Sequence, residues 1–157
     1  MNQNNKEEKS SKKADEKIAV IRIRGGIGIR HDIKKTLNFL RLYKQNYCVV
    51  VPKTQSYLGM INKVKDYVTW GEIDEETFNM LVEKRAEEYK GRETDRKGII
   101  SYKRKFIVIN GKKIKPFFRL NPPKKGFEKK GIKKPFSVGG ALGYRKEKIN
   151  DLLKRMI

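Results

Sequence analysis

The stretch from Lys112 to Lys134 limits the fold more than any other part of this chain. Ten of its residues are lysine or arginine, and its one acidic residue is Glu128. A folded core cannot bury so many like charges without partners, and a membrane helix cannot contain them. We therefore expect this stretch to lie at the surface. The phenylalanines, prolines and glycines between its cations are typical of a segment that meets phosphates and stacked bases; the alternative is a solvated basic tail.

The net charge of +21 is distributed unevenly along the 157 residues. From Lys90 onward, 22 lysines and arginines stand against 5 acidic residues, a difference of +17. Residues 1–89 carry 17 against 13, a difference of +4. Self-repulsion of this size disfavours a compact state without a partner of opposite charge. Nucleic acid is the first partner expected and an anionic membrane surface the second, but no basic helix with a broad apolar face supports the membrane.

Cysteine and histidine usage argues against most metal and catalytic sites. Cys48 is the one cysteine and His31 the one histidine, so we expect no disulfide, no metal and no other cofactor. Cys48 lies in an apolar run and is expected to be a small buried strand residue. A lone histidine without clustered carboxylates does not support a catalytic triad. Residues 1–17 are polar and no apolar run reaches a membrane span, so we expect a soluble protein of a reducing compartment.

Hydrophobic periodicity predicts a β-α-β-α-β order between residues 17 and 90. The expected strands are 17–24, 47–51 and 67–71. Apolar residues at helical spacing predict helices that begin near Asp32, Gln55 and Asp74. We expect Asp32 and Asp74 to cap their helices, because a side-chain oxygen there can accept from an unpaired backbone N–H group. This order is typical of an α+β layer of helices packed on one sheet.

Three regions are expected: a disordered tail at 1–16, a core domain at 17–90 and a basic extension at 91–157. The apolar run 106–109, followed by Asn110-Gly111 and the segment 112–118, predicts a β-hairpin, because Asn-Gly fits a type I′ turn. A last helix is predicted by apolar residues at helical spacing, which are Ile149, Leu152, Leu153 and Met156. We expect this helix to dock on the core domain.

A glycine-rich turn, Gly25–Gly28, follows the first expected strand, where a dinucleotide-binding fingerprint would lie. His31 stands where the third glycine of that fingerprint should be, and no acid follows the second strand. A plain turn is therefore favoured over nucleotide binding. The turn can still present backbone N–H groups and Arg30 to an RNA phosphate.

The aromatic residues fall into two groups. Trp70 and Phe78 lie in regular elements and are expected to belong to the core. The aromatics of the basic region, which can either anchor the extension or stack on bases, are Phe117, Phe118, Phe127 and Phe136. The sequence leaves both roles open for these four residues.

Two groups of motifs resemble one known family. The first runs from Arg24 to Leu42 and continues in Gly59-Met60-Ile61-Asn62-Lys63-Val64. The second comprises Phe118-Arg119-Leu120-Asn121-Pro122-Pro123, Gly126-Phe127, Gly139-Gly140, Gly143-Tyr144-Arg145 and Ile149-Asn150. In this order they are similar to large-subunit ribosomal protein thirty, in the longer form of archaea and eukaryotes. Ala141 stands where such relatives often carry an acid.

The resemblance implies an α+β fold with a three-stranded antiparallel sheet in the order 3-1-2, ferredoxin-like but lacking the last strand. It also implies a structural, non-enzymatic protein of the large ribosomal subunit in the cytoplasm. The implied partners are large-subunit rRNA, with the vicinity of 5S rRNA left open, and neighbouring ribosomal proteins, but no membrane and no small-molecule substrate. Two alternatives remain: a free RNA-binding regulator outside the ribosome and, with less support, an RNA-processing enzyme.

Sixteen basic residues are expected to bind RNA, mainly through its phosphates. Around the first turn and helix they are Arg22, Arg24, Arg30 and Lys34. At the second helix they are Lys63 and Lys65. In the extension they are Lys112, Lys113, Arg119, Lys124, Lys125, Lys129, Lys130, Lys133, Lys134 and Arg145. We also expect the extension to lack order away from RNA, because its charge leaves little to hold it closed.

Overall fold

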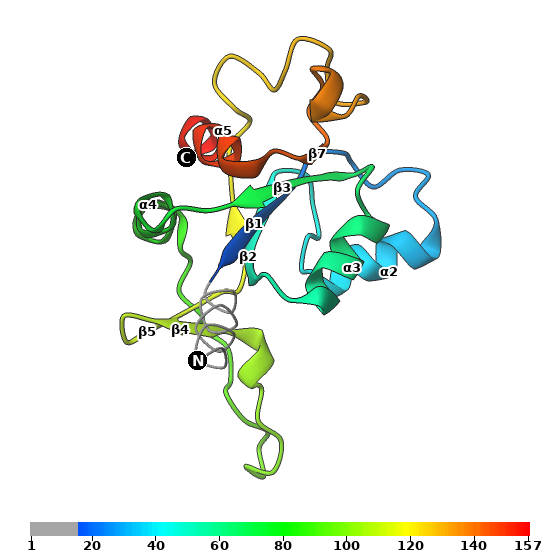
Figure 1. The fold of residues 1–157 in the computed structure, drawn as a ribbon. Coiled ribbons are helices and arrows are strands. Elements are labelled where there is room, and N and C mark those ends of the chain that lie inside the picture. The colour runs from blue at the N-terminus through cyan, green and yellow to red at the C-terminus, as the bar shows by residue number, and fades with distance from the viewer. Residues whose placement is uncertain (1–15) are drawn as a thin grey trace, which may run out of the picture.

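The computed structural model describes residues 16–157, which form a mixed five-stranded sheet with helices on both faces (Figure 1). A separate two-stranded hairpin lies at one end of this sheet. The α+β class expected from the sequence is confirmed. The tail expected at 1–16 lies outside the described residues, apart from Glu16.

The centre of the sheet consists of three antiparallel strands. They are β1 (Lys17–Arg22), β2 (Tyr47–Pro52) and β3 (Val68–Glu72). β1 lies in the middle, so that Val20 is paired with Val49 on one side and Trp70 on the other. The expected order of these three strands is confirmed.

β1 is buried on both faces. Ile18 and Val20 belong to one hydrophobic core, whereas Ala19 and Ile21 belong to a second core on the opposite face. Successive side chains of a strand point to opposite faces, so a middle strand covered on both sides must be apolar at every position. This requirement explains the uninterrupted apolar run at 18–21.

Helices α2 (His31–Phe39) and α3 (Gln55–Lys63) cover the first face. Leu37 and Ile61 are fully buried there. Arg30, and not Asp32, occupies the N-cap position of α2, and no side chain caps this helix. Asp32 lies in the first turn, where the helix dipole favours an acid.

Helices α4 (Glu75–Arg85) and α5 (Ile149–Met156) cover the second face. Leu81 of α4 and Leu152 of α5 are fully buried beside the odd-numbered residues of β1. Asp74 occupies the N-cap position of α4 as expected, but its side chain makes no cap hydrogen bond. Its backbone N–H donates instead to Asn150 Oδ1 at 3.1 Å, which joins the start of α4 to α5.

The extension adds two short strands that the sequence did not predict. β6 (Phe118–Arg119) pairs antiparallel with β2, and β7 (Gly143–Tyr144) pairs parallel with β3. The three expected strands are thus the centre of a five-stranded sheet in the order β6-β2-β1-β3-β7. Residues of the extension also complete the second core, since Phe118, Leu120 and Leu153 pack there.

The hairpin expected around Asn110-Gly111 is confirmed. β4 (Ile107–Ile109) and β5 (Lys112–Ile114) pair antiparallel, and the two turn residues have positive φ, 51° and 75°. A type I′ turn requires this geometry. The extension also contains three 3₁₀ turns, η1 (Lys103–Lys105), η2 (Phe136–Val138) and η3 (Lys146–Lys148).

Candidate RNA-binding surface

Most of the basic residues expected to bind RNA lie at the surface. Arg24 and Lys113 are half-buried, whereas Arg22 and Arg145 are buried. The exposed ones are Arg30, Lys34, Lys63, Lys65, Lys112, Arg119, Lys124, Lys125, Lys129, Lys130, Lys133 and Lys134. Apart from Arg119 on β6, they divide between two ends of the sheet.

The larger group gathers where β1 ends, and we call it the loop surface. It consists of the exposed cations in 24–34, 63–65 and 124–134. Hydrogen bonds to backbone oxygens bring these segments together, because the N–H of Ile23 donates to Tyr67 O at 2.9 Å and the guanidinium of Arg24 donates to Asp66 O at 3.3 Å. The segment 126–142 packs on Ile23 from the other side. Figure 1 shows this segment and the loop after β1 at the same end of the sheet.

The segment 121–142 is a loop that folds on itself. Backbone hydrogen bonds cross it: Lys130 N–H donates to Gly139 O at 3.2 Å, and Ala141 N–H donates to Gly131 O at 3.1 Å. Phe127 and Ile132 pack against Ile23, whereas the six lysines of 124–134 are exposed. The loop therefore presents its cations outward from a small apolar base.

The second group lies on the hairpin at the opposite end of the sheet (Figure 1). Lys112 is exposed, and Lys113 forms an ion pair with Glu93 and lies 5.5 Å from the centre of the Phe106 ring. We call this group, Lys112 and Lys113, the hairpin surface. It is separated from the loop surface by the length of the sheet.

The structure corrects the prediction for Arg22. Its side chain is only 5% exposed and donates to the backbone oxygens of Leu42 at 2.8 Å, Tyr43 at 2.9 Å and Arg24 at 3.0 Å. Burial lowers the pKa of this guanidinium. Arg22 thus ties the chain after α2 to the end of β1, and its guanidinium is directed into the protein and not to the surface.

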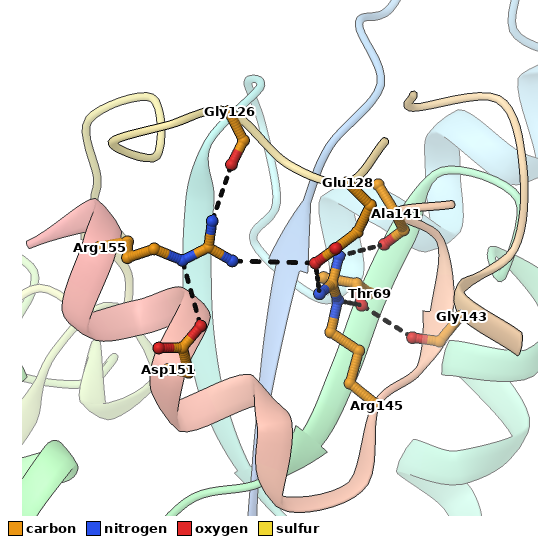
Figure 2. Close-up of polar contacts among 8 residues, drawn as sticks. All are labelled: Thr69, Gly126, Glu128, Ala141, Gly143, Arg145, Asp151 and Arg155. Atoms are coloured by element: carbon orange, nitrogen blue, oxygen red, sulfur yellow. Dashed lines mark hydrogen bonds and ion pairs between the residues drawn. The ribbon is translucent and has the colours of Figure 1, made fainter. Parts of the chain in front are cut away.

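Arg145 requires the same correction (Figure 2). It is 2% exposed, and its guanidinium donates to Glu128 at 2.8 Å, to Thr69 Oγ1 at 2.9 Å and to Ala141 O at 3.1 Å. The ring of Phe136 lies 4.5 Å from the guanidinium carbon. Burial lowers the pKa of Arg145, and the carboxylate of Glu128 opposes that shift. Each of its three nitrogens donates inside the protein, and the side chain is not presented to a phosphate at the surface.

Arg119 is exposed but not free. It forms an ion pair with Glu87, whose carboxylate also binds the ammonium of Lys115 at 2.7 Å. Arg119 first, and Lys115 after it, lower the pKa of Glu87 to about 2. Part of the charge of Arg119 is therefore neutralised within the protein.

The aromatics of the basic region act mainly as anchors. Phe117 stacks on Tyr47 with ring centres 5.2 Å apart and meets Tyr43 edge-to-face at 5.8 Å. Phe118 is buried, and Phe127 packs against two of the hydrophobic cores. Trp70 is buried as expected, whereas Phe78 is only half-buried and does not belong to the hydrophobic cores. The structure thus favours anchoring over base stacking for these phenylalanines.

Other exposed cations were not among the expected RNA contacts. Those of the arm at 91–102 and the turn that follows it are Arg92, Arg96, Lys97, Lys103, Arg104 and Lys105. Ile27, at the tip of the glycine-rich turn, is fully exposed. The charge of the arm is visible in the sequence, but no periodicity there indicates which side chains share a face.

Neither a metal site nor a membrane helix is evident in the part of the chain that the structure describes. No group of three or more His, Cys, Asp and Glu side chains among residues 16–157 is placed to hold an ion. None of the described helices is long and apolar enough to cross a membrane. Cys48 is buried, as expected, and burial raises the pKa of its thiol.

The fold and the two lysine-rich ends define a class: a small α+β protein with a surface suited to a polyanion. Comparison with known proteins identifies the family. The model of the family "Ribosomal protein L30p/L7e" matches residues 18–68. The "Large ribosomal subunit protein uL30" of Methanococcus maripaludis is 47% identical over 151 residues, which cover 88% of this chain and 98% of that protein.

Two further archaeal relatives carry the same name. The protein of Nanoarchaeum equitans is 49% identical over 88% of this chain and 97% of its own length. That of Methanopyrus kandleri is 44% identical over 86% of this chain and its full length. The chain belongs to the uL30 family, and the resemblance expected from its motifs is confirmed over the extension as well as the core.

Proposed function

We propose that this protein is a structural constituent of the large ribosomal subunit in the cytoplasm, where it binds large-subunit rRNA and carries out no catalysis of its own. The observation that supports this most directly is the loop surface, where six exposed lysines of 124–134 lie at the same end of the sheet as the loop after β1 that leads to Arg30 (Figure 1). Lysine is a point charge suited to phosphate, and such contacts position a protein on RNA more than they read its sequence.

The proposed RNA contacts omit the two buried arginines. The contacts that remain are Arg24, Arg30, Lys34, Lys63, Lys65, Lys112, Lys113, Arg119, Lys124, Lys125, Lys129, Lys130, Lys133 and Lys134. Because the loop surface and the hairpin surface lie at opposite ends of the sheet, we propose that they contact different RNA segments. Neighbouring ribosomal proteins are proposed as further partners, and a position near 5S rRNA stays open.

The test of location is sedimentation of native lysate through sucrose in moderately high salt, with the protein followed by mass spectrometry. Recovery in the large-subunit peak, in proportion to other large-subunit proteins, is the expected result. Recovery at the top of the gradient would instead favour a free RNA-binding regulator. Repeating the gradient at lower salt distinguishes weak association with the ribosome from none, because phosphate contacts weaken steeply as salt rises. A weakly bound protein moves to the large-subunit peak at low salt, and an unbound one does not.

A further inference from the structure

A buried polar network ties the basic loop to the body of the protein (Figure 2). At its centre Arg145 joins three segments: Thr69 on β3, Glu128 in the middle of the loop and Ala141 at the end of the loop. Thr69 extends the network by donating its hydroxyl to Gly143 O at 2.8 Å. Arg145 itself is positioned by β7 and by its backbone N–H, which donates to Trp70 O at 2.8 Å.

Arg155 holds the loop from a second direction. This residue of α5 donates to Gly126 O at 2.9 Å and lies 3.8 Å from the Glu128 carboxylate. Its Nε also lies 3.1 Å from Asp151 on the same helix. Since α5 is fixed by its apolar face in the second core, both arginines that meet Glu128 are attached to rigid elements.

Glu128 is the one acid among the six lysines of 124–134. Six like charges so close together repel one another and disfavour a compact loop when no RNA is present. The carboxylate of Glu128 points inward to two arginines and not outward to those lysines. Glu128 therefore attaches the loop to the body of the protein, and it does not neutralise the lysines, which stay available to bind phosphates.

We propose that Arg145 is a positioning residue, which with Glu128 holds the loop 121–142 in its RNA-binding shape before RNA is bound. The loop then meets RNA as a preformed surface and does not fold on it. This differs from the disorder that charge alone led us to expect for this part of the extension. The inference rests on the proposed function, because it concerns how the same lysines bind RNA.

The chemistry of Arg145 suits this role. A guanidinium is planar and offers donors in several fixed directions, so that one side chain can bond a carboxylate, a hydroxyl and a carbonyl together. An ammonium keeps the charge but cannot hold these three acceptors in the same geometry. Removing one partner of a buried ion pair leaves the other charge uncompensated. Glu128→Gln removes the carboxylate that binds Arg145 and is therefore also expected to loosen the loop.

The consequence for RNA binding is a loss of affinity without a loss of phosphate contacts. A loop that must be ordered during binding lowers affinity, and we expect Arg145→Lys to weaken binding to large-subunit rRNA about tenfold. The dependence of binding on salt should stay unchanged, since Arg145 meets no phosphate. A true phosphate contact, such as the one proposed for Lys129, should reduce the slope of log affinity against log salt by about 1 when it is removed.

The experiment combines amide hydrogen exchange of the free, full-length protein with rRNA binding at several salt concentrations. In the wild type, the amides of Lys130, Ala141 and Leu142 should be protected, because each donates across the loop. In Arg145→Lys and Glu128→Gln they should exchange faster, while amides of β1 and α2 keep their protection. Lys129→Ala is the matched control, with unchanged exchange and a shallower salt slope.

Three results would overturn the proposal. The first is a wild-type loop that exchanges as fast as an unprotected peptide. The second is unchanged loop exchange in both variants, and the third is a shallower salt slope in Arg145→Lys. If Arg145→Lys unfolds globally, Glu128→Gln and the wild-type exchange still decide the matter. Failure of the wild type to bind large-subunit rRNA would count against the proposed function alone, since loop protection is measured without RNA.

Discussion

At the scale of single residues, close backbone contacts and ion pairs determine which substitutions the protein tolerates. Gly140 is buried, and a Cβ atom there would lie 2.0 Å from the carbonyl oxygen of Lys134. Its backbone N–H donates to Pro135 O at 2.9 Å, so the two segments cannot separate without losing that bond. Glycine is required here because the backbones touch.

Gly140→Ala is expected to open the loop and weaken RNA binding while leaving the net charge unchanged. The clash involves backbone, which cannot move aside as a flexible side chain can. Exchange of the loop amides and affinity for large-subunit rRNA measure the effect. Gly59→Ala, at an exposed site of α3 with open space around its Cβ position, is the control and should stabilise the protein by about 1 kcal/mol. Equal behaviour of the two variants would contradict the close approach.

The lowered pKa of Glu87 predicts that the protein loses stability in acid. Its pKa lies at about 2 in the folded protein because of Arg119 and then Lys115, below its ordinary value of 4.5. A lowered pKa means that the carboxylate stabilises the fold above pH 4.5 and that this stabilisation is lost as the pH falls toward 2. Glu87→Gln should therefore lower Tm at pH 6 and flatten the fall of Tm between about pH 4.5 and 2.

The control for that measurement is Glu83→Gln, which removes one exposed acid from α4 without touching Arg119. Its Tm should follow the wild type across the same pH range. A Glu87→Gln variant that loses as much stability at pH 2 as at pH 6 would show that the ion pair does not respond to protonation of Glu87.

At the scale of elements, α5 is the part of the extension that binds most firmly to the core. Ile149, Leu152, Leu153 and Met156 form one fully buried face that packs against Ala19 and Ile21 of β1. The helix is short, so its stability comes from this packing and not from its own hydrogen bonds.

Leu152→Ala is expected to reduce the free energy of unfolding by about 2–5 kcal/mol, through lost burial and the cavity left in the second core. Chemical denaturation measures the change. Lys154→Ala, at an exposed position of the same helix, should stay within about 0.5 kcal/mol of the wild type. A small effect of Leu152→Ala would mean that α5 is only loosely docked.

The elements also show what the sequence could predict. Strands β1 to β3 and the helices between them carry clear periodicity, and Asn110-Gly111 marks the hairpin by its backbone geometry. β6 and β7 have two residues each, too few for alternation to be visible, and their pairing depends on segments far away in the chain. Their existence therefore required the three-dimensional structure.

The sequence predicted the exposed lysines of the candidate site but not its two buried arginines. Six lysines within 124–134 must be exposed because one acid cannot neutralise them, and they are exposed. Arg22 and Arg145 are indistinguishable from them by composition. Most of their partners are far away in the chain: the backbone oxygens of Leu42 and Tyr43 for Arg22, and Thr69 and Glu128 for Arg145. These partners leave no pattern near either arginine in the sequence.

At the scale of the whole molecule, the cations lie at two ends of a rigid sheet. Changes at distant sites without shared partners add independently. The loop surface and the hairpin surface should therefore make separable contributions to RNA binding, whereas a single continuous track would couple them.

Changing Lys124, Lys125, Lys129 and Lys130 together to Ala should reduce the slope of log affinity against log salt by about 3, if most of the four meet a phosphate. Changing the same four residues to Arg keeps the charge and should preserve the slope. The double change Lys112→Ala and Lys113→Ala should reduce the slope by a smaller amount, and this reduction should add to that of the fourfold Ala variant. An unchanged slope in the fourfold Ala variant would exclude the loop as a main contact.

The two short strands of the extension have a consequence for the protein on its own. A bare three-stranded sheet would present β2 and β3 as open edges, which invite a second copy to pair and begin aggregation. β6 covers the start of one edge, at Tyr47 and Cys48 of β2, and β7 covers the middle of the other, at Thr69 and Trp70 of β3. The segment that carries most of the positive charge thus also shortens the open edges on which a second copy could pair.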